Sequence, residues 1–205
     1  LRTRPYELNK GDADEKAAKW SEICKQSLDT MSNKVFKKNI EGMIEDFARI
    51  PISSEQKPRV GMVGEILIKY HPDANNQTIQ VIESEGGEAV PTELINFVLY
   101  CLYDDLPFSK HSSIGFWESF KNWALIWWIE RQRTVFCQAL AKYPRYGHIP
   151  PIHELAQPCR EVISLGHQGG EGWLLTAEML DMLKIVVPNL MCMQPFACLP
   201  NHITG

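Results

Sequence analysis

Residues 58–90 read PRVGMVGEILIKYHPDANNQTIQVIESEGGEAV, and this stretch decides the predicted fold. It alternates short apolar runs with polar, glycine- and proline-containing segments, which is typical of strands joined by loops and helices. The predicted elements are a strand at 59–63, a loop at 64–72, a helix capped by Asp73 that runs to about Glu85, and a strand at 88–90. The pattern predicts a β-loop-α-β unit with two parallel strands joined by a crossover.

The remaining sequence extends this unit in both directions. The helices expected from periodicity lie at 13–32, 34–49, 92–103, 116–143, 151–157 and 173–184, and a final strand lies at 189–194. We therefore expect an α/β fold, a layered parallel sheet with flanking helices (Rossmann- or flavodoxin-like), preceded by an N-terminal helical segment. The expected division is a helical segment and linker at 1–57 and an α/β domain at 58–205. Because the chain stops after a glycine without a final helix, we expect that domain to be truncated at its C-terminus.

Two side-chain patterns in the helices carry further expectations. The tryptophans and phenylalanines of 116–143 form a stripe that we expect to pack against the sheet or the N-terminal helices. Cys24, Cys101 and Cys137 lie within apolar helical patterns, so we expect them to be small buried side chains.

The composition excludes several classes of partner. The chain has 205 residues, 44% of them apolar, with a net charge of −4 and a pI near 5.9. Nucleic-acid-binding domains usually show a basic face, and none is seen, so we expect no nucleic-acid partner. No stretch reaches the ~18–20 apolar residues that cross a bilayer, so we expect no membrane partner. The six cysteines contain no Cys-x-x-Cys pair, which favours reduced thiols and a cytoplasmic location.

The first candidate site follows the strand at 59–63. Gly61, Gly64 and Glu65 lie where backbone N–H groups and a carboxylate can approach a ligand. Their spacing is neither a dinucleotide fingerprint nor a P-loop, and tight turns explain the glycines equally well. Asn75 and Asn76 follow Asp73; capping explains one polar residue there, so these amides are candidates for binding a ligand or a neighbouring loop.

The second candidate site is the glycine-rich turn GHQGGEG at 166–172. The candidate binding residues here are Gly169, Gly170, Glu171 and Gly172. They precede a predicted helix, whose N-terminus favours an anion by ~0.3–1 kcal/mol. Phosphate or carboxylate binding is one interpretation; occupation of the same position by Glu171 is the other. His167 is expected to be a hydrogen-bonding loop residue.

The third candidate site lies beyond the last strand, where Gln194, Cys198 and Asn201 occupy MCMQPFACLPNHITG at 191–205. Ligands of α/β proteins collect beyond the carboxyl ends of the strands. Cys198 is the candidate metal ligand, but an iron–sulfur cluster or a zinc ion needs three or four ligands. Cys192 is expected to point into the packing of the strand. We predict that the three glycine- and cysteine-bearing turns meet at one edge of the sheet. No catalytic residue is assigned.

Three segments, 58–90, SLGHQGGEGWLLTAEML at 164–180, and 191–205, occur in the order seen in a known family. The chain resembles the acyl-CoA dehydratase activase-related proteins, which are described as 2-hydroxyglutaryl-CoA dehydratase activators or CoA-substrate-specific enzyme activases. The resemblance covers 58–205 and is closest to their dehydratase-like region. The phosphate-binding motifs of the family's actin-like ATPase domains are missing from this sequence, so ATP hydrolysis is not assigned to it.

The resemblance implies a role in iron–sulfur-dependent electron transfer to 2-hydroxyacyl-CoA dehydration in an anaerobic or facultative bacterium. It implies that Cys198 in QPFACLPNH binds a [4Fe–4S] cluster in the full-length protein, that the glycine turns line the crevice, and that this fragment alone lacks the cluster. The implied partners are ATPase domains of the same polypeptide and a dehydratase-like protein, with acyl-CoA as a further candidate. The alternative is a non-catalytic α/β binding module that docks a partner protein or acyl-CoA without a metal.

Overall fold

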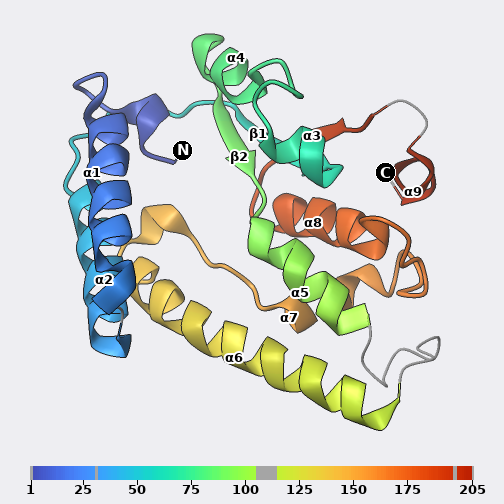
Figure 1. Ribbon diagram of the computed structural model, residues 1–205. Helices are drawn as coiled ribbons and strands as arrows, with labels where there is room; N and C mark the ends of the chain where they lie inside the picture. The colour runs from blue at the N-terminus through green and yellow to red at the C-terminus, as the bar shows by residue number, and fades with distance from the viewer. Residues whose placement is uncertain (1, 31, 105–114, 196–197, 205) are drawn as a thin grey trace. The chain divides into compact units, whose positions relative to one another are not determined.

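The computed structural model describes residues 2–30, 32–104, 115–195 and 198–204, and is a mixed α/β structure (Figure 1). It divides into two compact units, residues 1–57 with 130–149 and residues 58–129 with 150–205. One division between the units falls at 57/58, and residues 130–149 belong with the N-terminal segment. Within the described residues, no helix is both long and apolar enough to cross a membrane.

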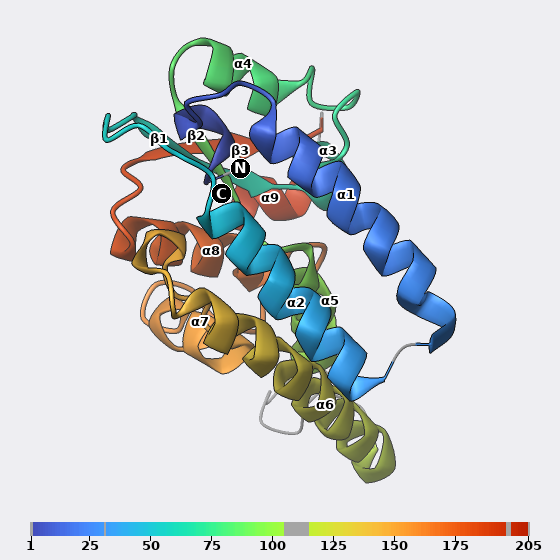
Figure 2. The same cartoon turned by 90° about the vertical axis from the view of Figure 1, so that its left-hand side faces the viewer.

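Unit 1 is built on two helices, α1 (Asp12–Ser27) and α2 (Asn33–Ala48), which lie side by side (Figure 2). Asp46 joins them, because its Oδ2 accepts hydrogen bonds from Lys19 Nζ at 2.6 Å and Trp20 Nε1 at 2.9 Å. The Trp20 ring also covers Gly42, where an added Cβ would lie 2.7 Å from Cη2 of the ring. A larger residue at position 42 would therefore push the two helices apart.

The rest of unit 1 comes from short 3-10 helices and from the second half of a long helix. These elements are η1 (Arg4–Tyr6), η2 (Leu28–Thr30), η3 (Pro144–Tyr146) and, from residue 130 onward, α6 (Phe116–Leu140). Ala139 and Leu140 of α6 form a buried cluster with Ile44 of α2. The apolar face of α2 is thus covered within unit 1.

Unit 2 contains a three-stranded parallel sheet in the order β2-β1-β3. Its strands are β1 (Arg59–Gly64), β2 (Glu88–Pro91) and β3 (Asn189–Met193). β1 is central and pairs with both neighbours, with Val60 opposite Ala89 on one side and Asn189 on the other. The parallel sheet and the mixed α/β class predicted from the sequence are confirmed.

Helices cover both faces of this sheet. The helices of unit 2 are α3 (Ile66–Tyr70), α4 (Thr78–Ser84), α5 (Leu94–Asp104), the first half of α6, α7 (Ile152–Cys159), α8 (Gly172–Lys184) and α9 (Leu199–Thr204). On one face Met62 and Met193 pack with Ile82 of α4. On the other, Val90 and Val187 pack with Met182 of α8. Burial of both faces is the usual state of a parallel sheet.

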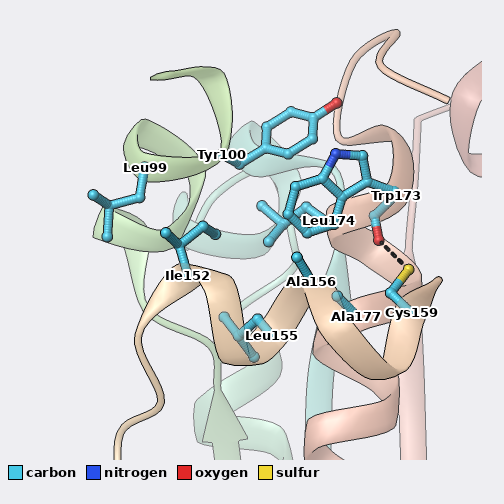
Figure 3. Packing of buried hydrophobic residues seen from close by; sticks show 9 residues of the cluster. All are labelled: Leu99, Tyr100, Ile152, Leu155, Ala156, Cys159, Trp173, Leu174 and Ala177. Carbon is cyan, nitrogen blue, oxygen red and sulfur yellow. Dashed lines mark hydrogen bonds between the residues drawn. The ribbon is translucent and has the colours of Figure 1, made fainter. Parts of the chain in front are cut away.

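The largest core of unit 2 lies among α5, α7 and α8 (Figure 3). Trp173 is fully buried at its centre, and the Tyr100 ring meets it edge-on with the ring centroids 5.1 Å apart. Cys159 closes the cluster from α7, where its Sγ donates to the backbone oxygen of Trp173 at 3.3 Å. Burial raises the pKa of the Cys159 thiol to about 11. This cysteine is therefore a packing residue.

The helix predicted at 73–85 differs in the structure. Within 73–85 the only helix is α4, which begins at Thr78. A second short helix, α3, lies earlier, inside the predicted loop at 64–72, and a turn joins the two. Asn76 and Gln77 have positive φ angles of 54° and 57°, which a helix cannot accommodate. Asp73 therefore lies in the turn and not at a helix start.

Two expectations about burial are wrong. The aromatic residues of α6 between 116 and 128 are largely exposed. Cys101 is exposed, and Cys24 and Cys137 are half-buried. The physical reason is that α6 is apolar on nearly every side between 116 and 129, so the side that carries Ser119, Ile126 and Ile129 packs within unit 2 and its other sides are left at the surface.

Candidate functional site

The carboxyl ends of β1 and β3 meet at Gly64. Gly64 is paired with Met193, and the backbone N–H of Glu65 donates to Met193 O at 2.9 Å. Gly64 has a φ of +126°, and an added Cβ would lie 1.9 Å from that same carbonyl oxygen. Only glycine permits this approach, so Gly64 fixes the junction between the two strand ends.

Two carboxylates satisfy the first turn of α3. Glu65 is its N-cap residue, and its Oε2 accepts from Ile68 N at 3.0 Å. Glu171 is buried, and its Oε1 accepts from Ile66 N at 2.8 Å. Because Glu171 belongs to the glycine-rich turn, this hydrogen bond attaches that turn to the end of β1. Glu171 is the N-cap residue of α8, where the sequence placed it, but its side chain makes no cap hydrogen bond there and binds α3 instead.

The glycine-rich turn also contacts the segment that follows β3. An added Cβ at Gly170 would lie 3.0 Å from Pro200 Cγ of α9. Gly172 has a φ of +43°, and its added Cβ would lie 2.0 Å from His167 O, which accepts from Trp173 N at 2.8 Å. The turn is closed on itself, while Gly170 lies against Pro200 of α9. The predicted meeting of the three segments therefore occurs at the carboxyl edge of the sheet.

Cys198 lies at the start of α9 and is half-buried. Cys192 on β3 is exposed and does not point into the packing, as the sequence had suggested. Desolvation around its sulfur raises the pKa of Cys192, and the Cys198 thiol raises it further.

Asn201 is the most unusual polar residue in this region. It is 2% exposed, and within the described parts of the chain neither Nδ2 nor Oδ1 has a hydrogen-bond partner. A buried polar group left without a partner costs about 1–3 kcal/mol. The amide can therefore bind a ligand or an ordered water that satisfies both atoms. Gln194, also predicted here, is exposed.

The other predicted residues lie elsewhere or have partners within the protein. Gly61 lies inside β1, where its added Cβ would be 2.8 Å from Leu190 Cδ2. Asn75 is buried; its Nδ2 donates to Ile68 O at 2.9 Å and its Oδ1 accepts from Thr78 N at 3.1 Å. Asn76 is exposed in the turn before α4. The structure thus places Gly61 and Asn75 in supporting positions.

A buried ion pair between α3 and α8 was missed by the sequence reasoning. Lys69 Nζ lies 2.8 Å from Glu178 Oε2, and the two side chains are 3% and 2% exposed. Burial raises the pKa of Glu178, and Lys69 partly offsets this. Tyr70, next to Lys69, donates to Thr92 O at 3.1 Å, and burial raises its pKa as well. The available signal was a single charge within each apolar run, ILIKY and WLLTAEML.

Metal ligands do not gather in one place among the residues that the structure describes. No group of three or more His, Cys, Asp or Glu side chains there could hold a metal ion. Cys192 and Cys198 are both free thiols.

Comparisons with known proteins do not assign the chain to a family. No protein-family model, no curated protein and no solved structure matches it.

Proposed function

We propose that this chain is the dehydratase-like region of an activase-related protein and contributes to iron–sulfur-dependent electron transfer to acyl-CoA dehydration. The observation that carries the proposal is the convergence of the three segments on which the resemblance rests. Glu171 binds the first turn after β1, and Gly170 lies against Pro200 of α9. Segments more than 100 residues apart thus form one edge, as expected if they serve one site.

The residues present complete only part of a cluster site. Cys198 and Cys192 offer at most two sulfur ligands, whereas a [4Fe–4S] cluster takes four. In the proposal, Cys198 is one ligand, and the others come from another segment of a longer polypeptide or from a dehydratase-like partner. Asn201 is the residue of this chain best placed to donate a hydrogen bond there, because its buried amide has no partner in the described residues. A bound cluster would supply one-electron transfer.

Reconstitution of the complete natural polypeptide with iron and sulfide, without oxygen, tests the ligand assignment. We expect Cys198→Ala to lose iron and visible absorbance together. The matched control is Cys101→Ala, which removes an exposed thiol on α5 and should leave both unchanged. If Cys198→Ala keeps the full iron content of the unsubstituted protein, Cys198 is not a ligand and the proposal fails at this residue.

A metal-free binding module is the second candidate, and Asn201 favours it. An amide that lacks both a donor and an acceptor partner is complementary to another amide, and the pantetheine arm of acyl-CoA carries two. Calorimetric titration of the metal-free chain with an acyl-CoA would test this. Binding that is lost in Asn201→Leu supports the module with acyl-CoA as its ligand. The absence of heat at millimolar acyl-CoA excludes this ligand and leaves a partner protein as the module's binding partner.

The proposal also includes a Rossmann- or flavodoxin-like layering and a cytoplasmic location. The layering is supported by parallel strands in the order β2-β1-β3 with helices on both faces. The location is supported by six cysteines without a Cys-x-x-Cys pair.

A further inference from the structure

The first half of α6 carries an exposed stripe of aromatic side chains. Their exposure ranges from 51% for Phe120 and Trp123 to 75% for Phe116. We call this stripe the aromatic seam; it comprises Phe116, Phe120, Trp123 and Trp127, with Trp117 and Trp128 beside it. Isolated exposed apolar residues are normal, but a contiguous apolar patch of this kind marks an interaction site.

One flank of the same helix segment, next to the seam, is already packed. Ile126 and Ile129 lie against the core cluster around Trp173, and Ser119 is buried. A helix that is apolar on all sides is normally buried on all sides. The seam is therefore a surface that requires a cover, and α6 is held in place by its packed side.

The spacing of the seam indicates a helix as the cover. Its residues follow one another at intervals of four, three and four, which is the spacing of the apolar positions in a coiled-coil seam. At 100° per residue they form one narrow line along the helix. Phe120 and Trp123 already stack on each other, with ring centroids 6.0 Å apart and planes inclined by 27°. Such a line of large side chains fits the groove of a facing helix.

The area of the patch matches that of a stable dimer. A covered aromatic side chain buries about 150–250 Å². Six such side chains that are half to three-quarters exposed therefore offer roughly 700 Å². Each partner of a standard interface contributes about 800 Å².

Charge identifies the occupant. Residues 116–129 carry one acidic and one basic side chain, Glu118 and Lys121, so two copies of this surface do not repel each other. A helix that lies on a membrane surface has a polar face rich in Lys and Arg, and this segment has a single lysine. We propose that the aromatic seam binds the same seam of a second copy of this chain, across a two-fold axis.

Analytical ultracentrifugation of the 205-residue chain at micromolar concentration tests the proposal. We expect a species of twice the chain mass of 23.5 kDa. Trp123→Lys and Phe120→Lys should each weaken the dimer by at least ~100-fold, because aromatic anchors dominate interfaces and each substitution enters twice. Val162→Lys is the matched control: Val162 is 65% exposed on the same unit outside the seam, and this variant should dimerise normally. Circular dichroism spectra of all variants should coincide.

Tryptophan fluorescence gives a second measurement. Dilution of the unsubstituted chain should shift its emission to the red as the seam is uncovered, and the Trp123→Lys chain should show no such shift. A monomer at ~100 μM, well above the micromolar limit expected for an interface of this area, overturns the proposal. So does a dimer that survives both seam substitutions, or binding of the chain to vesicles of neutral phosphatidylcholine with no self-association.

Discussion

Replacement of Lys69 by methionine removes the countercharge of a buried carboxylate. Lys69 and Glu178 are 2.8 Å apart and almost fully buried. At an effective dielectric constant of about 20, this separation corresponds to roughly 6 kcal/mol of attraction. The attraction offsets a desolvation cost of several kcal/mol for each ion. Glu178 Oε1 has no hydrogen-bond partner within the described residues, and besides Lys69 only the Thr92 side chain there favours the charged carboxylate.

We therefore expect Lys69→Met to lower the free energy of unfolding by about 3–5 kcal/mol at neutral pH. The double variant Lys69→Met/Glu178→Leu should return to within ~1 kcal/mol of the unsubstituted chain, because no buried charge remains. The exposed pair Lys142–Glu41, whose atoms are 3.5 Å apart, is the control. Removal of Lys142 should cost below ~1 kcal/mol.

The loss in Lys69→Met should depend on pH. Burial already raises the pKa of Glu178 above its usual 4.5, and removal of Lys69 takes away a group that lowers it. A carboxyl whose pKa is higher in the folded state gives full stability below its unfolded pKa. That stability is lost as the pH rises towards the folded pKa. The destabilisation should therefore be smallest near pH 4.5 and increase towards neutral pH.

Urea denaturation, with hydrogen exchange of the α8 amides as a probe of unit 2 alone, measures these effects. The reasoning is refuted if Lys69→Met costs below ~1 kcal/mol at neutral pH. It is equally refuted if the double variant is no more stable than the single variant, since the two residues would then be energetically independent.

Three further predictions concern separate features. Gly64→Ala should destabilise unit 2 by at least ~3 kcal/mol in urea melts, because the new Cβ would overlap the carbonyl oxygen of Met193. Gly86→Ala is the control: Gly86 has a φ of +85° and open space around it, so the substitution should cost only ~1 kcal/mol. Equal losses in the two variants would contradict this. At pH 8, Cys159 should react with iodoacetamide at least ~100-fold more slowly than the exposed cysteines, because burial raises its pKa from 9.0 to about 11. Mass spectrometry measures the labelling, and rapid labelling of Cys159 would show that the core opens. A hydrogen bond from the Lys19 ammonium holds the pKa of Asp46 below its usual 3.8. The stability that the Asp46 carboxylate contributes is therefore present above pH 3.8 and is lost as the pH falls through the lower pKa of the folded state. Asp46→Asn should flatten the acid side of the curve of stability against pH, and an unchanged acid midpoint would argue against this.

The sheet could be predicted because its signals are local. Each strand is a short apolar run bounded by glycine, proline or polar residues, and the β1-helix-β2 order permits only parallel pairing of neighbours. Gly64 was identified as a residue at the carboxyl edge for the same reason. The sequence could not tell that Gly64 is required by the approach of Met193 O, because that contact joins segments 129 residues apart.

The missed features depend on tertiary contacts. α3 has five residues, too few for periodicity to reveal a helix, and its first turn is completed by Glu171 from another segment. The Lys69–Glu178 pair joins residues 109 apart in the chain. The exposure of the aromatic stripe was mispredicted because periodicity gives the direction of an apolar face but not whether anything lies against it.

The central position of β1 determines how the sheet can grow. β1 has hydrogen-bonded neighbours on both sides, whereas β2 and β3 are the outermost strands in the part of the chain that the structure describes. Additional strands can join beside β2 or β3, as long as the new edges are themselves protected. Insertion next to β1 would instead break an existing ladder. Strands added beside β2 or β3 would therefore leave the junction at Gly64 between β1 and β3 intact.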